Sequence, residues 1–348
     1  MSRPGFHLLL IPAVCLLLFA CASQQPVADV EPASFVHEIG EGPLPWTDQG
    51  FDNSAEKFTF ALFSDLTGGE REGIFSVAIE QLRLLRPELI VSVGDLIEGG
   101  TTDREQLAGE WDSFDQRAKR ARAPVFYAGG NHDLTNPVMW EVFDERYGKR
   151  YYHFVYKNTL FLILDTEDNT LQEQWELKKI RDEAMQTIED EGWGVFYETN
   201  YGKSPLRAYG MVGDEQAAYF REVIARYPDV LHTFVISHKP TWEQEGEVNF
   251  STLEAALSDR PYTVFFGHEH DYQYEQRHGR DYIGLGTTGG VQNTSKGMPI
   301  DHVTLVTVSG SGVDIANLRM SGIFGKDGSL PLNGDDMCFD ARKCGAPD

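Results

Sequence analysis

Residues of the types that bind metal ions follow several apolar runs of the chain, each at the point where the run ends. They occur in the segments Ser64-Asp65-Leu66-Thr67, Gly94-Asp95, Gly130-Asn131-His132-Asp133, Ser237-His238 and Gly267-His268-Glu269-His270. Carboxylate, amide and imidazole donors without thiolates suit a hard or borderline divalent cation. The pattern therefore predicts a metal site assembled from distant segments of the chain.

The apolar runs before these residues have the length and composition of buried strands. A strand, an amphipathic helix and a second strand are expected in succession, at Phe58–Ser64, Ile74–Leu85 and Leu89–Val93. The two strands of such a unit are parallel, so Asp65 and Asp95 are expected at the same carboxyl edge of a sheet. Further strands are expected before the other polar segments, at Pro124–Ala128, Leu231–Ile236 and Tyr262–Phe266.

The remaining pattern predicts one domain over residues 50–325. Helices are expected at 104–122, 138–147 and, with Asp214 as N-cap, 214–227, and a hairpin at 151–156 and 159–164. Alternating hydropathy at 282–285, 303–308 and 313–318 predicts a second, antiparallel sheet. Segment 167–212 joins a charged helical stretch to an aromatic, irregular one. We interpret it either as a lid over the site or as an insertion whose aromatic residues pack it onto the body.

Taken one at a time, these residues have ordinary explanations. An Asp after a strand is usually a turn or cap residue, and a buried His is usually a hydrogen-bonded core residue. The combination of Gly94-Asp95, Gly130-Asn131-His132-Asp133, His238 and Gly267-His268-Glu269-His270, in this order, resembles the calcineurin-like metallophosphoesterase family. The resemblance covers Phe58 to about Leu318. It implies an α/β fold, a four-layer αββα sandwich of two mixed β-sheets flanked by helices, with the metal site at the carboxyl ends of the strands.

The resemblance also implies a role for each of the matching residues. Asp95 is expected to bridge two metal ions, with Asn131, His238 and His268 completing one position and Asp65 and His270 holding the other. His132 is expected to be the catalytic acid, oriented by Asp133. One or two divalent ions (Mn, Fe, Zn or Ni) and a small phosphoester substrate, with a nucleotide as one option, follow from the same resemblance.

One position departs from the family pattern. The family begins its first motif with Asp-x-His, and this chain has Asp65-Leu66-Thr67. A threonine hydroxyl is a poor metal ligand, so Thr67 is a doubtful member of the first position. Two interpretations stay open: a phosphoesterase with an atypical first metal site, or a non-catalytic protein of the same fold that binds metal and phosphate ligands.

The amino-terminal sequence is typical of an exported lipoprotein. Arg3 precedes an apolar stretch too short to span a bilayer, and Leu18-Phe19-Ala20-Cys21 resembles a bacterial lipobox. We expect a signal peptide at 1–20, lipidation of Cys21, a flexible tether over 21–49 and anchoring to a membrane of the bacterial cell envelope, facing the periplasm or the exterior. An ordinary signal peptide with an incidental cysteine is the alternative.

Cys338 and Cys344 lie together in the C-terminal tail, residues 326–348. A disulfide is the expected use of this pair in an oxidising compartment, because a zinc site lacks obvious partner ligands nearby.

The charge of the chain restricts its partners. Thirty Lys and Arg against 54 Asp and Glu give a formal net charge of −24. So acidic a protein is not expected to bind nucleic acid or anionic lipid through bulk electrostatics. A phosphate group must therefore be attracted locally, by metal ions or by a few cationic side chains.

Overall fold

The computed structural model describes residues 54–295 and 297–345. The predicted signal peptide, the lipidated Cys21 and the tether lie outside the described residues. Within that part of the chain, no helix combines the length and the hydropathy needed to cross a membrane.

Two mixed β-sheets form the centre of the fold. The first has the strand order β11-β10-β1-β2-β3, with bounds β1 (Phe58–Phe63), β2 (Leu89–Ser92), β3 (Val125–Phe126), β10 (His302–Ser309) and β11 (Gly312–Arg319). The second has the order β4-β5-β6-β7-β9-β8, with bounds β4 (Tyr152–Tyr156), β5 (Thr159–Ile163), β6 (His232–Ser237), β7 (Tyr262–Phe266), β8 (Gln273–Arg277) and β9 (Arg280–Gly284). In each sheet the central strands are parallel and antiparallel strands extend one or both edges.

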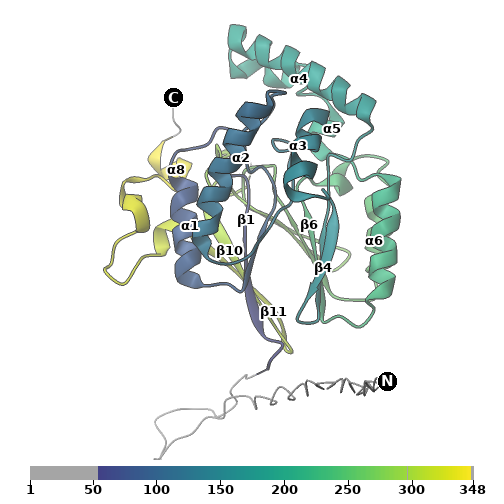
Figure 1. Ribbon diagram of the computed structural model, residues 1–348, viewed down its shortest axis with the longest axis vertical. Coiled ribbons are helices and arrows are strands. Elements are labelled where there is room, and N and C mark those ends of the chain that lie inside the picture. The colour runs from purple at the N-terminus through teal and green to yellow at the C-terminus, as the bar shows by residue number, and fades with distance from the viewer. Residues whose placement is uncertain (1–53, 296, 346–348) are drawn as a thin grey trace, which may run out of the picture. The chain divides into compact units, whose positions relative to one another are not determined.

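Helices cover the outer faces of the two sheets, and Figure 1 shows them on either side. Their bounds are α1 (Ile74–Leu85), α2 (Arg104–Ala118), α3 (Pro137–Tyr147), α4 (Leu171–Glu191), α5 (Pro205–Tyr209), α6 (Asp214–Arg226), α7 (Asn249–Ala256) and α8 (Ala341–Cys344). Short 3-10 turns are η1 (Lys119–Ala121), η2 (Trp193–Glu198), η3 (Thr241–Glu243), η4 (Met320–Gly322) and η5 (Pro331–Asp336). The α/β class and the αββα sandwich expected from the resemblance are confirmed.

Three hydrophobic cores hold the layers together. Aromatic side chains fill the space between the sheets: the Phe60 ring of β1 lies 5.1 Å from Phe161 of β5 and 4.8 Å from Phe234 of β6. A second core joins the first sheet to α1, α2 and α3, and a third joins the second sheet to α6 and α7. Because both faces of the central strands are covered, these strands are apolar along most of their length.

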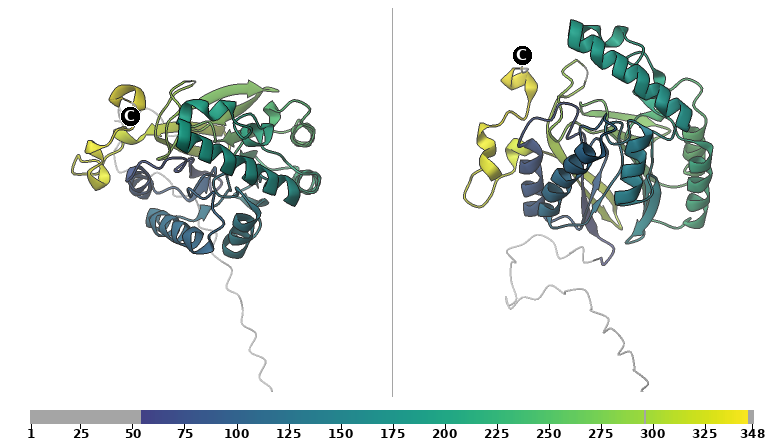
Figure 2. Two further views of the ribbon diagram at one scale, coloured as in Figure 1. Left: turned by 90° about the horizontal axis from the view of Figure 1, so that it is seen from above. Right: turned by 45° about the horizontal axis from the view of Figure 1, so that its top comes forward.

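The expected segment 167–212 forms a projecting insertion made of α4, η2 and α5. Thr170 caps α4 with a complete capping box, in which the side chains and backbone of Thr170 and Glu173 exchange hydrogen bonds. The insertion has its own small core around Leu177, Ala184 and Tyr201. Viewed from above, α4 lies across the ends of the sheets (Figure 2).

Two expectations about local structure are wrong. The strand expected at 282–285 belongs to β9, which pairs with β7 and β8 in the second sheet, whereas β10 and β11 extend the first sheet beside β1. Alternating hydropathy identifies a strand but not its partner, which explains this error. Asp214 is the first helical residue of α6, and Gly213 is the cap. An acidic residue at that position still interacts favourably with the helix dipole.

The C-terminal tail is part of the folded body. Leu330 and Phe339 are buried in the core that covers α1, and a disulfide joins Cys338 to Cys344. The tail also contacts a loop of the first sheet, because the backbone N–H of Asp301 donates to the carbonyl oxygen of Phe339.

Candidate metal centre

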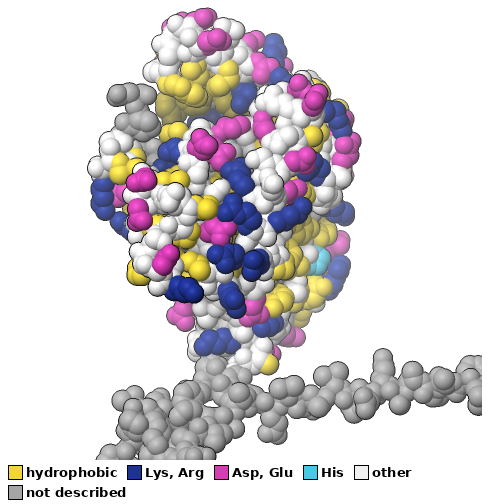
Figure 3. Space-filling model, turned by 60° about the vertical axis from the view of Figure 1, so that its left-hand side comes forward, with side chains coloured by type: hydrophobic (Ala, Val, Ile, Leu, Met, Phe, Trp, Pro, Cys, Tyr) yellow, Lys and Arg dark blue, Asp and Glu magenta, His cyan; other side chains and the backbone are white. Residues whose placement is uncertain are grey.

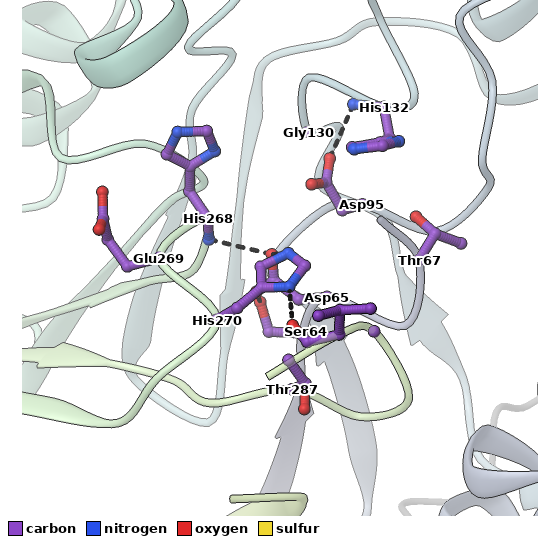
Figure 4. Close-up of polar contacts among 12 residues, drawn as sticks. Ser64, Asp65, Thr67, Asp95, Gly130, His132, His268, Glu269, His270 and Thr287 are labelled. Carbon is purple, nitrogen blue, oxygen red and sulfur yellow. Dashed lines mark hydrogen bonds and ion pairs between the residues drawn. The ribbon is translucent and has the colours of Figure 1, made fainter. Parts of the chain in front are cut away.

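The strands bring the polar segments of the sequence to one edge of the molecule. Asp65 follows β1, Asp95 follows β2 and the 131–133 segment follows β3, all parallel neighbours in the first sheet. His238 follows β6 and His268 follows β7 in the second sheet. Figure 4 shows side chains from both sheets converging at this edge.

The cluster contains two sets of donor atoms, and each set could hold one metal ion. Asp95, His238 and His268 form one set, and Asp65, Asp95 and His270 form the other. Within each set the donor atoms lie within 4.8 Å of one another. Asp95 belongs to both sets, and a carboxylate with two oxygens can bridge two ions. The structure thus brings together the residues expected to hold the two metal positions.

Asn131 belongs beside the first of these sets. Its side-chain oxygen Oδ1 lies 3.3 Å from Nε2 of His238, which in turn lies 3.3 Å from Oδ2 of Asp95. The amide oxygen, the imidazole nitrogen and the carboxylate oxygen therefore face one point. This mixture of oxygen and nitrogen donors suits Mn, Fe, Zn or Ni.

Backbone carbonyl groups fix the orientation of two histidine ligands. Nδ1 of His238 lies 2.8 Å from the carbonyl oxygen of Val93, and Nδ1 of His270 lies 2.5 Å from that of Val291. Each Nδ1–H donates to its carbonyl, which leaves Nε2 directed at a carboxylate of the site. Metal-binding histidines are commonly oriented in this way.

The side chains of Asp95 and His238 lie so close to the backbone of Gly130 that a side chain at this position would collide with them. A Cβ there would lie 2.3 Å from Oδ1 of Asp95 and 2.8 Å from Cε1 of His238. Any larger residue would displace the Asp95 carboxylate, so this glycine is required by the geometry of the site.

Four of the expected ligands have an unusual backbone conformation. Positive φ angles are found at Asp65 (50°), Asp95 (56°), His268 (72°) and His270 (58°). Side chains other than glycine adopt this left-handed region at a cost of about 1–2 kcal/mol each. Such strain concentrates at functional sites, where the surrounding structure holds it in place.

The carboxylates of the site attract positive charge. Burial opposes protonation of His238, yet the negative charge of Asp95 and its hydrogen bond raise the pKa of His238 to about 9. Burial likewise opposes protonation of His270, and the hydrogen bond and charge of Asp65 raise the pKa of His270 to about 9. Burial tends to raise the pKa of Asp95, but the charges of His238 and His132 hold it well below its usual range. The negative electrostatic potential of the carboxylates therefore favours a cation at both positions.

His268 has the opposite electrostatic environment. Burial, followed by the nearby charges of Lys239 and His238, lowers the pKa of His268 well below its usual value. A neutral imidazole is the form that coordinates a metal ion, so His268 is prepared for this role.

His132, the expected catalytic acid, lies beside Asp95. The backbone N–H of His132 donates to Oδ1 of Asp95 at 2.8 Å, as Figure 4 shows. Its ring Nδ1 lies 2.9 Å from the carbonyl oxygen of Glu98 and 3.8 Å from the Glu98 carboxylate. With Nδ1 held there, Nε2 is the ring atom available to a substrate.

The expected orientation of His132 by Asp133 does not fit the structure. The Asp133 carboxylate accepts hydrogen bonds from the backbone N–H groups of Leu96, Ile97 and Gly130, at 2.8, 3.1 and 2.8 Å. The side chain is fully buried, and this use of its oxygens ties the loop after β2 to the loop after β3. Asp133 therefore positions backbone, and Glu98 replaces it as the partner of the His132 ring.

Thr67 is directed away from the metal-binding atoms. Its hydroxyl donates to the carbonyl oxygen of Ile97 at 2.8 Å, and its side chain is buried. Figure 4 shows Thr67 apart from the Asp65–His270 pair. The Thr67 hydroxyl is thus used by a backbone carbonyl, and Asp65, Asp95 and His270 are the grouped residues that could hold an ion at this position within the described part of the chain.

Sequence reasoning missed two residues that support the site. Glu98 accepts hydrogen bonds from the backbone N–H groups of Gly69 and Glu70 as well as supporting His132. Lys239, directly after His238, forms a fully buried ion pair with Glu167. The lysine after a predicted ligand was a usable signal, but its partner lies more than seventy positions away, which the sequence alone does not reveal.

The donors fit divalent metal ions in chemistry and direction. Two mixed sheets with convergent Asp, Asn and His side chains at the strand ends define a metal-binding α/β protein. The sequence model of the family described as calcineurin-like phosphoesterase matches residues 58–272, more than half of the chain. The chain belongs to this family, and with it to the metal-dependent phosphoric ester hydrolases.

Several solved structures are similar to this chain. A dimetal phosphatase from Danio rerio is 16% identical, with 75% of this chain and 98% of that chain covered and a TM-score of 0.46. A purple acid phosphatase from yellow lupin is 13% identical, with coverage of 78% and 53% and a TM-score of 0.47. A putative 5'-nucleotidase from Staphylococcus aureus is 13% identical, with coverage of 80% and 57% and a TM-score of 0.46. A search of curated proteins finds no match.

Proposed function

We propose that this protein hydrolyses phosphate mono- or diesters with water as the nucleophile, at the centre bridged by Asp95. The observation that carries the proposal is the pair of donor sets that share Asp95, with His132 hydrogen-bonded to the same carboxylate. Bound divalent ions supply the positive charge that polarises a phosphoryl group and acidifies water.

The residues around the ions have separate tasks in this proposal. Asp95 holds the two positions together, and its acceptance of the His132 backbone N–H fixes the acid relative to the phosphoryl group. His132, once protonated, donates its Nδ1–H to the Glu98 carbonyl and can deliver the Nε2 proton to the leaving oxygen.

The two positions are unequal in this proposal. Asp95, Asn131, His238 and His268 give one position four donors, whereas Asp65, Asp95 and His270 give the other only three, because Thr67 supplies none. We expect the Asp65–His270 position to bind its ion more weakly.

The His132→Ala variant tests the catalytic assignment. It is expected to retain the metal content of the wild type and to lose about 10²- to 10⁴-fold in turnover of phenyl phosphate. The loss should be smaller for p-nitrophenyl phosphate, whose leaving group needs less protonation. His278→Ala, an exposed histidine in the turn between β8 and β9, is the matched control. Equal losses on both substrates, or no loss, would contradict the role of His132 as an acid.

A non-catalytic protein that binds metal and phosphate ligands is the second candidate. It is favoured by one observation, namely that Thr67 uses its hydroxyl for a backbone carbonyl and leaves the first position short of a ligand. Metal binding without turnover of monoester, diester or nucleotide substrates would support this candidate over the first.

We also propose that the protein is exported and anchored by a lipid on Cys21. The lipobox-like segment supports this proposal, and the Cys338–Cys344 disulfide suits an oxidising compartment. Mass spectrometry of the protein purified from membranes tests it: an acylated Cys21 is expected, and an unmodified amino terminus beyond residue 21 would contradict it.

A further inference from the structure

The insertion formed by α4, η2 and α5 is tied directly to the metal centre. Its two ends pair at Glu167 and Met211, which closes it as a compact excursion from the second sheet. Glu167 forms the buried ion pair with Lys239, and Nζ of Lys239 also donates to the carbonyl oxygen of Leu206 in α5 at 3.0 Å. Because Lys239 follows His238, the insertion is anchored one residue from a metal ligand.

Tyr201 is a buried residue of the insertion, in its small core with Leu177 and Ala184. Its side chain is only 8% exposed, and its hydroxyl has no hydrogen-bond partner among the residues that the structure describes. Burial is the largest cause of a raised pKa at Tyr201; the charges of Arg181 and Arg207 oppose that rise, and those of Glu167 and Asp95 add to it.

Arg181 and Arg207 are cations without a carboxylate partner in the described part of the chain. Nη1 of Arg181 reaches the carbonyl oxygen of Gly100 at a long 3.4 Å, beside the loop that holds His132. Arg207 lies over the rings of Phe196 and Tyr197, at 5.5 and 5.9 Å from their centroids, and its buried Nε has no hydrogen-bond partner.

Unpaired arginines are unexpected here because acidic residues outnumber basic ones by 54 to 30. Several other partly buried arginines have carboxylate partners, as in the pairs Arg71–Asp301, Arg117–Glu70, Arg146–Asp115 and Arg150–Asp165. Two cations and a phenol hydroxyl, all with unused donors, are the chemistry that binds an oxyanion.

We propose that Tyr201, Arg181 and Arg207 form a subsite that binds a second anionic group of the substrate. The inference rests on the proposed function, in which the metal centre holds the phosphoryl group that is hydrolysed. It defines the substrate class as phosphoesters whose alcohol part carries a carboxylate or a further phosphate. The acidic surface repels such dianionic molecules, so the donors of the insertion are needed to bind the second charge locally.

The insertion also has exposed aromatic side chains, which offer an apolar surface to a substrate. Trp193 and Tyr197 are 70% and 68% exposed, and Tyr197 stacks under Arg207. Figure 3 shows hydrophobic side chains on the underside of the lobe that projects at the top of the molecule. An apolar linker between the two anionic groups can pack against such surfaces.

Calorimetric binding to the Mn²⁺-loaded protein tests the subsite without requiring turnover. The probes are phenylphosphonate, 3-carboxyphenylphosphonate and benzene-1,3-diphosphonate, which share one ring and differ in the second group. The wild type is expected to bind at least one of the two doubly substituted probes about tenfold more tightly than phenylphosphonate, since a charge-assisted hydrogen bond contributes about that much. The preferred probe distinguishes a carboxylate from a phosphate as the second group.

Variants assign that preference to the subsite. Arg207→Gln, Arg181→Gln and Tyr201→Phe should each remove most of the tenfold preference and leave the affinity for phenylphosphonate unchanged. Lys203→Gln, which removes an exposed charge of the same insertion, should change neither. Melting curves of every variant verify that the insertion stays folded.

Two results would overturn the proposal: equal wild-type affinity for all three probes, or variants that weaken every probe equally. The proposed hydrolysis is tested separately with phenyl phosphate. If the protein shows the preference but hydrolyses no ester, the proposed subsite stands and the proposed hydrolysis is wrong.

Discussion

The hydroxyl of Thr67 donates a hydrogen bond to the carbonyl oxygen of Ile97 at 2.8 Å, which joins the loop after β1 to the loop after β2. These loops carry Asp65 and Asp95. The residue that departs from the family pattern therefore joins the loops of two proposed ligands, and in our proposal it is not a ligand itself.

Replacing Thr67 by valine tests this interpretation. Thr67→Val keeps the shape but removes the hydrogen bond, so we expect a loss of about 1–3 kcal/mol in the free energy of unfolding. Metal content, measured by elemental analysis, should not change. Thr67→Ser keeps the hydroxyl and should be closer to the wild type in stability. Loss of one ion per chain in Thr67→Val, with stability unchanged, would show that Thr67 is a ligand after all.

The buried ion pair between Lys239 and Glu167 holds the insertion to the metal centre. Lys239→Met leaves the Glu167 carboxylate buried without its partner and is expected to cost about 3–5 kcal/mol in the free energy of unfolding. Adding Glu167→Gln should recover much of this loss, because no uncompensated charge remains. Denaturant unfolding of the two single variants and the double variant measures the coupling. Purely additive effects would mean that the two residues do not depend on each other.

A chain of contacts joins the C-terminal disulfide to His270, in the metal position that we propose to be the weaker one. The backbone N–H of Ala341 donates to Gln292, whose amide donates to Asp301, and Asp301 pairs with Arg71. Arg71 in turn donates to the carbonyl of Gly290, next to Val291, which orients His270.

Replacing Cys338 and Cys344 by serine should therefore loosen this region. The loss of a short disulfide loop is expected to cost about 2 kcal/mol. Metal titration should show weaker binding at the Asp65–His270 position and unchanged binding at the Asn131–His238–His268 position. Equal weakening at both positions would argue against the path through Gln292 and Arg71.

The stability of the protein should depend on pH through His302. Burial lowers the pKa of His302 to about 4, below its unfolded value, and its Nε2 accepts the backbone N–H of Gly286 at 2.9 Å. The neutral form belongs to the folded state, so this contribution is fully present above pH 6.5 and is lost as the pH falls from 6.5 towards 4. Between pH 7 and pH 5 the loss is about 2 kcal/mol.

Comparison with His302→Gln isolates this effect from the other titrating groups. The wild type should lose about 2 kcal/mol more than the variant between pH 7 and pH 5, as measured by denaturant unfolding. Parallel losses in the two proteins would show that His302 is not the source.

Much of the fold and of the site could be predicted because each ligand follows a strand. Buried strands such as β1, β2 and β7 are continuous apolar runs, and a polar Asp or His directly after them is visible in one sequence. β8 was not predicted, since Gln273–Arg277 is an exposed edge strand of mostly polar residues. Neither its length nor its hydropathy distinguishes it from a loop.

The parts that escaped prediction depend on contacts between distant segments. Asp133 stands next to His132 in the sequence, but the loop after β2 supplies the N–H groups that bind its carboxylate. Glu98 is a single residue without a pattern around it, and its position follows only from the packing of the loops. Adjacency in sequence was the wrong guide to which side chains meet.

Metal titration of the purified protein, with hydrolysis of phenyl phosphate followed in the same samples, tests the central claim most directly. The account predicts two ions per chain of unequal affinity, with His270→Ala removing the weaker event and His268→Ala removing the tighter one. Turnover should rise as the ions bind. Binding of both ions without hydrolysis of any monoester, diester or nucleotide would contradict the assignment of this chain as a working phosphoesterase.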